Sequence, residues 1–389
     1  MHRFDAITAE ALRSSGSMKW TTYPDAIGAF VAESDFGVDP EIAVALHAAV
    51  DRGLVGYLPP AERTALAEAC ADFHRLRFGW EIDPGDVHPI GDVISALELT
   101  LAHFSAPGSK VVVPTPAYMP FLEVPLLAGR EIVEVPFATE ADGRSVFDLE
   151  ALDAAFADGG GLLVLTNPHN PLGRVFTREE LSAVSEVVER HGARVFADEI
   201  HAPMVYPGAV HVPYASISEV TAGHTVTATS ASKAWNLPGL KCAQLILSNA
   251  ADVKRFRPLK QEATIGAGTL GVVANAVAYR RGGPWLDEVV EYLDGNRRLL
   301  AERVPELLPG VRMRQPEGTY IAWLDCRELG LGEHPARFFR KNAGVVLTNG
   351  IDCGEAGAGF ARLIFATPRP ILEEMLTRMA AALDDLSAR

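Results

Sequence analysis

A lysine among small, uncharged residues is the side chain of this sequence best suited to covalent chemistry. Lys233 lies in the segment TSASKAWNLPG, residues 229–239, which contains no other charged residue. A lysine amine that is partly removed from water has a lowered pKa and can act as a nucleophile or a Schiff-base partner. Because an isolated lysine is ordinarily a solvated surface residue, other polar residues must decide between the two interpretations.

The same segment also fits a serine-based mechanism. Ser230 to Lys233 matches S-x-x-K, the motif of penicillin-binding proteins and class A β-lactamases, which use a serine nucleophile. That motif needs a helix that continues past the lysine, together with S-D-N and K-T-G elements. Pro238 follows five residues after Lys233 and interrupts a helix, and neither triplet occurs in the chain. The serine mechanism is therefore disfavoured.

Short apolar runs alternate with an amphipathic stretch and predict the scaffold around this lysine. The predicted strands are residues 110–113, 162–166, 193–197 and 225–229, and the predicted helix is 178–191, which Gly192 ends. A strand, helix, strand order predicts a parallel sheet with right-handed crossovers, an α/β fold.

Unusual polar residues follow these predicted strands directly. They are Asn170, Asp198, His201, Ser230 and Lys233. The carboxyl ends of parallel strands meet at one edge of a sheet, where ligands of open α/β sheets bind. The sequence therefore predicts one ligand site built from all five.

Asp198 and His201 together indicate a catalytic site more strongly than either residue does alone. A carboxylate at the end of an apolar strand must be paired, hydrogen-bonded or protonated. Asp198 alone is equally typical of a helix N-cap, and His201 alone is typical of a loop. With Lys233 nearby, the three favour a catalytic site. No second His or Cys stands at ligand spacing, so no metal site is predicted.

Two further segments are candidates for holding a ligand. The loop NPHNPLG, residues 167–173, is rich in turn formers, and Asn170 within it can bind a ligand oxygen. Gly91, Asp92 and Val93 precede a predicted helix, residues 95–104, whose first backbone N–H groups can bind an anion.

Composition limits the possible partners. The chain has 389 residues with 35 Lys and Arg against 50 Asp and Glu, a formal charge of −15, which disfavours nucleic acid and anionic membrane surfaces as partners. Four scattered cysteines and the lack of a membrane-spanning run favour a cytoplasmic protein. We expect a large domain over residues 45–280 and a smaller one formed by 1–44 with 281–389.

Several motifs, taken in order, resemble the fold-type I pyridoxal-phosphate (PLP) enzymes, the aspartate aminotransferase superfamily. The resemblance is nearest to the MalY/PatB-type cystathionine β-lyases and covers almost the whole chain from Lys19. Its motifs are KW at 19–20, VAESDF at 31–36, GY at 56–57, PAYMPF at 116–121, TNPHNPLGRVFTREEL from 166, ADEIHAPMVY from 197, SASKAWNLPGLK from 230 and LTNGIDCGEAGAGFARLIFATP from 347. It implies a three-layer αβα large domain and a smaller α+β domain.

The resemblance also implies a role for each site residue. Lys233 forms the Schiff base with PLP and moves the substrate's Cα proton, while Asp198 pairs with the pyridine nitrogen. Asn170 and His201 contact the ring's phenolic oxygen, and Tyr118 stacks on the ring. The phosphate contacts are Asp92, Val93, Ser230, Ser232, Lys241 and, from the neighbouring subunit of a homodimer, Tyr57. Arg362 binds the carboxylate of the amino-acid substrate, and Asn170 and Tyr57 also contact the substrate.

The implied activity is that of a carbon–sulfur β-lyase, which converts cystathionine or a related cysteine derivative to pyruvate, ammonia and a thiol. A class I/II aminotransferase uses the same residues and is the alternative. A non-catalytic, regulatory member of the fold is a third interpretation, which the presence of Lys233 disfavours. The chain departs from the family pattern at Lys241, where aminotransferases have arginine, and at Glu33 and Ser34, near the substrate.

Overall fold

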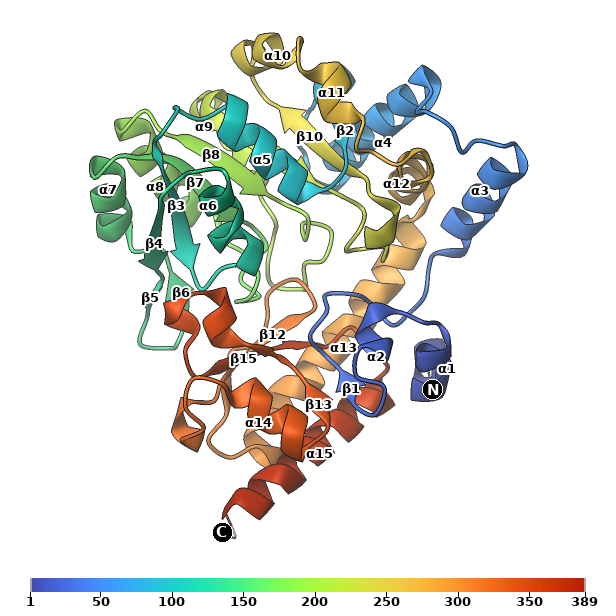
Figure 1. Ribbon diagram of the computed structural model, residues 1–389, viewed down its shortest axis with the longest axis vertical. Coiled ribbons are helices and arrows are strands. Elements are labelled where there is room, and N and C mark those ends of the chain that lie inside the picture. Colours follow the sequence, from blue (N-terminus) through green and yellow to red (C-terminus); the bar gives the residue numbers. More distant parts are fainter. Residues whose placement is uncertain (1, 388–389) are drawn as a thin grey trace.

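A central sheet of seven strands forms the large layer of the molecule (Figure 1). The computed structural model describes residues 2–387. The strands lie in the order β2 (Val87–Ile90), β10 (Ala243–Leu247), β9 (Thr225–Thr229), β8 (Arg194–Asp198), β7 (Gly160–Thr166), β3 (Lys110–Thr115) and β4 (Ile132–Pro136). From β9 to β4 the strands are parallel, which confirms the parallel sheet expected from the sequence. β10 runs antiparallel to both of its neighbours.

Buried apolar side chains point alternately to the two faces of the central sheet, which explains why helices cover both faces. Val111 and Val113 of β3 are buried in a cluster with residues of α5 (Val93–His103), whereas Val112 is buried with residues of α7 (Leu149–Ala157) and α8 (Arg178–Arg190). Successive strand side chains point to opposite faces, so both must be covered by apolar helix faces. The three-layer αβα architecture is thus confirmed.

The predicted helix 178–191 corresponds to α8. The Thr177 side chain accepts a hydrogen bond from the backbone N–H of Glu180, and the Glu180 side chain accepts one from the backbone N–H of Thr177. This capping box fixes the start of the helix. Gly192 follows the helix with φ of 60°, a left-handed conformation that glycine adopts without strain. Local sequence signals therefore set both ends of this helix.

A second, antiparallel sheet is formed by the last third of the chain. Its order is β11 (Arg312–Met313), β12 (Ile321–Asp325), β15 (Phe360–Ile364) and β14 (Thr348–Asn349). Around it lie α13 (Gly283–Leu307), α14 (Pro335–Asn342) and α15 (Arg369–Ser387). In Figure 1, α13 runs from the side of the central sheet down to this second sheet.

The start of the chain lies with this part of the molecule but forms a sheet of its own. β1 (Ile27–Gly28) pairs in parallel with β13 (Val345–Val346) in a separate two-stranded sheet, and both strands lie in the lower half of Figure 1. The domain boundaries at residues 45 and 280 stay a prediction. The other elements are α1 (Ala9–Ser14), α2 (Met18–Thr21), α3 (Pro40–Asp51), α4 (Pro60–Phe78), α6 (Val124–Leu127), β5 (Ala138–Thr139), β6 (Ser145–Val146), α9 (Glu219–His224), α10 (Ala250–Phe256), α11 (Lys260–Thr264) and α12 (Thr269–Arg281).

A buried ion pair anchors the segment that follows α2. Lys19 Nζ lies 2.7 Å from Asp35 Oδ2, and Trp20 Nε1 donates to Asp35 Oδ1 at 2.8 Å. All three side chains are buried. The same segment is also bonded to Asn236. The side-chain amide of Asn236 accepts from the backbone N–H of Ser34 at 3.0 Å and donates to the backbone carbonyl of Ser34 at 2.9 Å. We call residues 30–36 the arm; it is tied both to α2 and to the loop that carries Lys233.

Within residues 2–387, no helix is both long and apolar enough to cross a membrane. In the same range no group of three or more His, Cys, Asp or Glu side chains is arranged to hold a metal ion, and the four cysteines are free and buried.

The anchor gives a stability prediction. Asp35→Ala leaves the Trp20 N–H without its acceptor and the buried Lys19 ammonium with only the carbonyls of Glu33 and Ala366, both at 3.3 Å, so we expect the free energy of unfolding to fall by about 3 kcal/mol or more. Glu374→Ala is the control, because it removes only the exposed Arg378–Glu374 pair and is expected to cost under about 0.5 kcal/mol. Guanidinium denaturation measures the free energy of unfolding of both variants. Equal losses in the two would contradict a stabilising role for the buried Lys19–Asp35 ion pair.

Candidate active site

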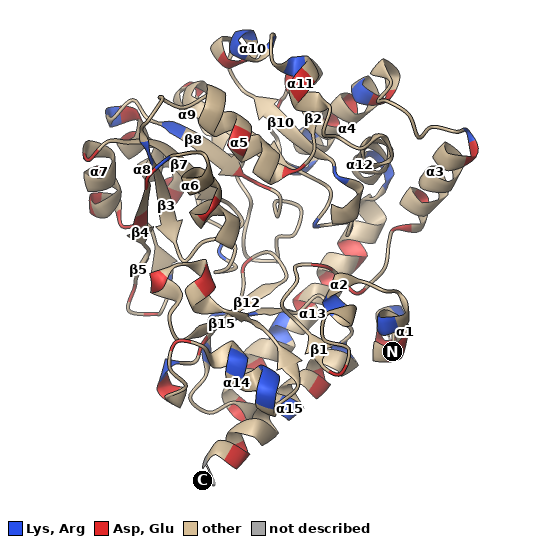
Figure 2. Cartoon of the chain, in the orientation of Figure 1, with Lys and Arg blue, Asp and Glu red and all other residues tan. Residues whose placement is uncertain are grey.

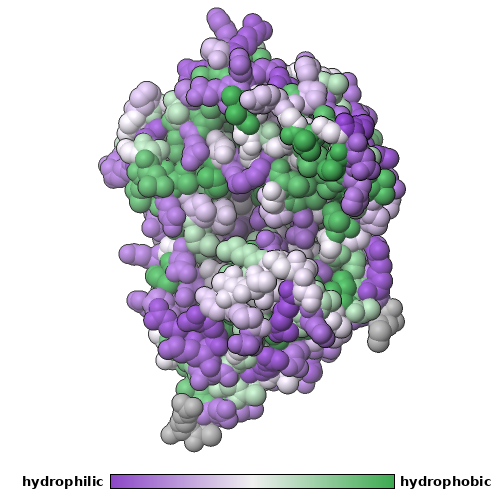
Figure 3. Space-filling model, turned by 45° about the vertical axis from the view of Figure 1, so that its right-hand side comes forward, coloured by the Kyte–Doolittle hydropathy of each residue, from purple (hydrophilic) through white to green (hydrophobic). Residues whose placement is uncertain are grey.

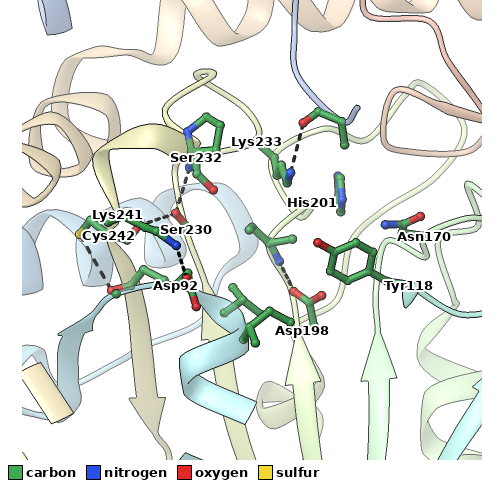
Figure 4. A pocket seen from close by; sticks show the side chains of 17 residues that line it. Asp92, Tyr118, Asn170, Asp198, His201, Ser230, Ser232, Lys233, Lys241 and Cys242 are labelled. Carbon is green, nitrogen blue, oxygen red and sulfur yellow. Dashed lines mark hydrogen bonds and ion pairs between the residues drawn. The ribbon is translucent and has the colours of Figure 1, made fainter. Parts of the chain in front are cut away.

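A cavity lies at the edge of the central sheet where the parallel strands end. We call it the inner cavity; its volume is about 190 Å³. Ten residues predicted from the sequence line it: Asp92, Val93, Tyr118, Asn170, Asp198, His201, Ser230, Ser232, Lys233 and Lys241. Figure 4 shows Lys233, His201, Asn170, Tyr118 and Asp198 around one space. The structure therefore brings together residues that the sequence places up to 149 positions apart.

Lys233 is largely withdrawn from water. Its Nζ donates a hydrogen bond to the carbonyl of Ala32 in the arm at 3.1 Å. Burial lowers the pKa of the Lys233 amine to about 8, with a further contribution from the Arg362 charge, while Asp198 and Glu33 oppose the shift. The amine is thus neutral in a useful fraction of molecules near neutral pH, as a nucleophile or proton acceptor requires.

Asp198 ends β8 and is buried, with one hydrogen bond from the backbone N–H of Ile200 at 3.1 Å. Burial raises the pKa of the Asp198 carboxyl to about 7, although the Ile200 N–H and the Lys233 charge lower it in part. A carboxylate in such a site becomes stable when a cation is placed beside it. The protonated pyridine nitrogen of PLP is a group of this kind.

His201 supplies an unsatisfied polar atom to the same cavity. Its Nδ1 is buried and has no hydrogen-bond partner in the described part of the chain. Burial, together with the charges of Lys233 and Arg362, lowers the pKa of His201 well below its usual value, so the ring is neutral. A buried polar atom without a partner costs free energy that a ligand can recover. The side chains present fit PLP.

The opposite end of the inner cavity has the features of an anion site. α5 begins there, and Asp92 caps it by accepting from the Ser95 N–H at 2.8 Å. Lys241 Nζ lies 2.7 Å from Asp92 Oδ2. Burial alone would raise the pKa of Asp92, but hydrogen bonds from Lys241 and Ser95 outweigh it and lower the pKa. Lys241 is therefore held beside the helix N-terminus, where positive charge and backbone N–H groups favour a phosphate.

Two serines complete this end. Ser230 Oγ donates to the carbonyl of Cys242 at 2.7 Å and accepts from the Ser232 N–H at 3.0 Å. These bonds fold residues 230–233 into a tight turn directly after β9. The turn directs Lys233 toward Ala32 and leaves the serines on the side of Lys241 (Figure 4).

A larger cavity continues from the inner one and contains Arg362. We call it the outer cavity; its volume is about 650 Å³, and Ala32, Tyr118 and Lys233 line both. Arg362 on β15 is 3% exposed. Its Nη1 donates to Asn170 Oδ1 at 3.1 Å, and its Nη2 donates to the carbonyl of Phe30 at 3.1 Å and to Thr348 Oγ1 at 3.3 Å.

The Arg362 guanidinium has no carboxylate partner among the described residues, and its Nε is buried without a hydrogen bond. Burial lowers the pKa of this guanidinium, but an arginine keeps its proton in proteins. A buried cation bonded only to neutral oxygens fits an incoming carboxylate, which a guanidinium binds with two parallel hydrogen bonds.

Tyr57 is not part of this group within one chain. Its side chain is fully exposed and lines a separate cavity with Val55 and Ile265. The predicted contact of Tyr57 with the site of a neighbouring subunit therefore stays a prediction.

Sequence reasoning missed two groups of the site. The Ala32 carbonyl accepts from both Lys233 and the Tyr320 hydroxyl, the latter at 2.9 Å. The Tyr320 ring stands edge-on to His201, with centroids 5.9 Å apart. A backbone carbonyl has no signal in the sequence. Tyr320 lies in the run GTYIAWLD, which the sequence indicated only as part of the smaller domain.

The buried amine gives a pH prediction for the cofactor-free protein. A neutral amine reacts with acetic anhydride and an ammonium does not, so the modification rate of Lys233 should reach half its maximum near pH 8. A synthetic peptide of residues 229–237 is the control, with a lysine amine that titrates at about 10.4. Mass spectrometry of the Lys233 peptide measures both rates; superimposed pH profiles would show that the fold leaves this amine unperturbed.

Known proteins that are similar to this chain agree with the PLP site indicated by the geometry. Residues 27–379 match the family Aminotransferase class I and II. A cystathionine beta-lyase of Corynebacterium glutamicum is 40% identical over 96% of this chain and 98% of its own length. Cystathionine beta-lyase PatB of Bacillus subtilis is 34% identical over 92% of this chain and 93% of its own length.

Two solved structures are also similar. A PLP-dependent beta-cystathionase from Corynebacterium diphtheriae has a TM-score of 0.92 and 38% identity, covering 97% of this chain and 98% of that one. A PLP-bound structure from Clostridium difficile, named as an aminotransferase, has a TM-score of 0.92 and 28% identity, covering 98% and 100%. The family and the fold-type I architecture expected from the sequence are confirmed: the chain belongs to the aminotransferase class I and II family.

Proposed function

We propose that this protein is a PLP-dependent carbon–sulfur β-lyase that acts on cystathionine or a related cysteine derivative. The observation that carries the proposal is the buried amine of Lys233 between two features, the Asp198 carboxylate in the inner cavity and the Arg362 guanidinium in the outer one. The names of relatives at 34% to 40% identity over nearly the whole chain support the carbon–sulfur bond as the target.

The side chains of the inner cavity are suited to hold PLP. Asp198 would pair with its pyridine nitrogen, Asn170 and His201 would contact its phenolic oxygen, and Tyr118 would stack on its ring face. The phosphate would lie at the N-terminus of α5, with Asp92 and Val93 backbone, Ser230, Ser232 and Lys241. When bound, PLP supplies an aldehyde for the substrate amine and a ring that withdraws electrons from the bonds at Cα.

The chain's own residues supply orientation and proton transfer. Arg362 binds the α-carboxylate and so fixes which bond of Cα faces Lys233. Lys233, with its lowered pKa, takes the Cα proton, after which the Cβ–S bond breaks and the sulfur leaves as a thiol. Overall, cystathionine and water give pyruvate, ammonia and homocysteine.

Transamination is the second candidate, because the similar structure from Clostridium difficile is named as an aminotransferase. It needs the same Lys233, Asp198 and Arg362, and the two reactions differ in the fate of the Cα proton. A difference of about 1.4 kcal/mol between the two barriers changes their ratio tenfold. A keto acid is required as second substrate only by the aminotransferase.

We also propose a homodimer in the cytoplasm. The exposed large apolar side chains Val44, Val50, Val55, Tyr57 and Ile265 support an interface on the part of the chain around α3 and the loop before α4. Three of them line one cavity of about 750 Å³. Figure 3 shows apolar patches in the upper half of the visible face, on either side of a hollow. Large exposed apolar patches mark interaction sites.

The lyase is tested by incubating PLP-loaded protein with cystathionine and no keto acid. We expect pyruvate, ammonia and homocysteine in equal amounts, and a loss of about 100-fold or more in kcat for Lys233→Ala, because a positioned proton-transfer group contributes at least that factor. Borohydride reduction followed by peptide mapping should place the pyridoxyl group on Lys233. Product formation only with an added keto acid would favour the aminotransferase instead.

The shared site is tested by mixing two inactive variants. Tyr57→Ala and Lys233→Ala each lack one part of every site, whereas a mixed dimer has one complete site. After subunit exchange we expect about a quarter of the wild-type activity, since half of the dimers are mixed and each has one active site of two. Asp198→Ala mixed with Lys233→Ala is the control for unshared sites, because both residues line the cavity of one chain and no mixed dimer then has a complete site. No recovery beyond the separate variants would mean that Tyr57 does not act across subunits.

A further inference from the structure

We infer that the outer cavity contains a second carboxylate subsite, formed by Arg337 and Arg340 of α14, which binds the distal carboxylate of the substrate's leaving group. This inference rests on the proposed lyase function and names its substrate class: cysteine thioethers whose sulfur carries an amino-acid side chain, rather than simple S-alkyl cysteines.

The two arginines belong to the wall of the outer cavity. Arg337 and Arg340 are three positions apart on α14, so they lie on one helix face, and both line the cavity that also contains Arg362. Figure 2 shows that the charged residues of α14 are basic. Within residues 2–387, neither guanidinium takes part in an ion pair with an acidic side chain, although the protein carries a formal charge of −15.

Arg340 is held in position by aromatic rings. Its Cζ lies 5.3 Å from the ring centroid of Tyr23, and the Tyr23 ring meets the Phe30 ring edge-on at 5.6 Å. The carbonyl of Phe30 accepts from Arg362 at 3.1 Å. A cation over an aromatic face is attracted by the ring and loses orientational freedom without being neutralised. The guanidinium of Arg340 is thus oriented yet free to bind an anion.

Arg337 and Arg340 lie at a different place in the outer cavity from Arg362, so they can bind a different carboxylate. Arg362 is buried beside Asn170 at the inner end of the cavity, next to the reacting amine, whereas Arg337 and Arg340 are exposed at its outer wall. One guanidinium binds one carboxylate in the bidentate mode. A substrate with two carboxylates, one on Cα and one beyond the sulfur, matches cations at both ends of a single cavity.

Acidic residues of the same cavity fit the other charge of such a leaving group. Glu33 of the arm and Asp352 line it, and no ion pair of either is recorded among the described residues. The homocysteine half of cystathionine carries an ammonium as well as a carboxylate. A wall with both signs of charge favours this zwitterion and gives a neutral alkyl group nothing to bind except apolar surface.

The test compares L-cystathionine with S-propyl-L-cysteine, whose leaving chain has three carbons and no charge. In Arg337→Ala/Arg340→Ala we expect kcat/KM for cystathionine to fall about tenfold or more, chiefly through KM, and that for S-propyl-L-cysteine to stay within about twofold. Lys341→Ala is the matched control, because Lys341 lies on the same helix, is exposed and does not line the cavity. Arg362→Ala should impair both substrates. Arg337→Lys/Arg340→Lys should recover part of the loss.

Each outcome decides the matter. Equal losses for both substrates, or no loss for cystathionine, would overturn the subsite while leaving the lyase intact. Absence of pyruvate from wild-type protein with either substrate would overturn the lyase. The subsite is then judged by the Kd of the two compounds for PLP-loaded Lys233→Ala, with and without the two arginine substitutions. Selective weakening for cystathionine supports it, and unchanged Kd values overturn it.

Discussion

The partial or complete burial of three charged side chains without full pairing is the constraint on which this structure depends. Asp198 and Arg362 are buried and Lys233 is partly buried, and none of the three forms a close ion pair with another in the described chain. Desolvation disfavours the charged form of each, which raises the pKa of the carboxyl and lowers that of the amine. Such an arrangement persists only because the surrounding fold holds it, and a ligand with complementary charges stabilises it.

The arm is the part of the fold that holds these groups. The carbonyl of Phe30 accepts from Arg362, that of Ala32 accepts from Lys233 and Tyr320, and both backbone groups of Ser34 bind Asn236. Backbone oxygens solvate a cation without neutralising it, so the two cationic groups keep their affinity for anions or electrophiles. The Lys19–Asp35 pair fixes the arm from the other side, which explains why a buried ion pair occurs so far from the chemistry.

Local signals in the sequence were enough to predict the scaffold, but they could not predict contacts between residues far apart in the chain. The apolar strand runs, the helical pattern that Gly192 ends and the polar residues after the strands were enough to predict a parallel sheet and one ligand edge. The antiparallel β10 was not predicted, because an apolar run carries no information about strand direction. The contacts of Ala32 join residues 201 and 288 positions apart and involve a carbonyl, so neither spacing nor side-chain type could reveal them. The roles of Tyr118, Asn170 and Arg362 came from family resemblance, and their positions in one pair of joined cavities agree with those roles.

Specificity has a different physical origin from reactivity in this arrangement. We assign elimination and transamination to the same residues, Lys233 and Asp198 in the inner cavity and Arg362 in the outer one, so these three do not distinguish the two reactions. In the proposed function, the leaving group of the substrate would extend away from Lys233 into the outer cavity, where Glu33 replaces a residue of the usual lyase pattern and α14 contributes unpaired arginines. Because contacts made far from the reacting bond select among substrates without altering the proton-transfer geometry, the outer wall can diverge while the inner residues stay fixed. Differences among relatives in what they cleave should therefore be sought on the arm and on α14 rather than around Lys233.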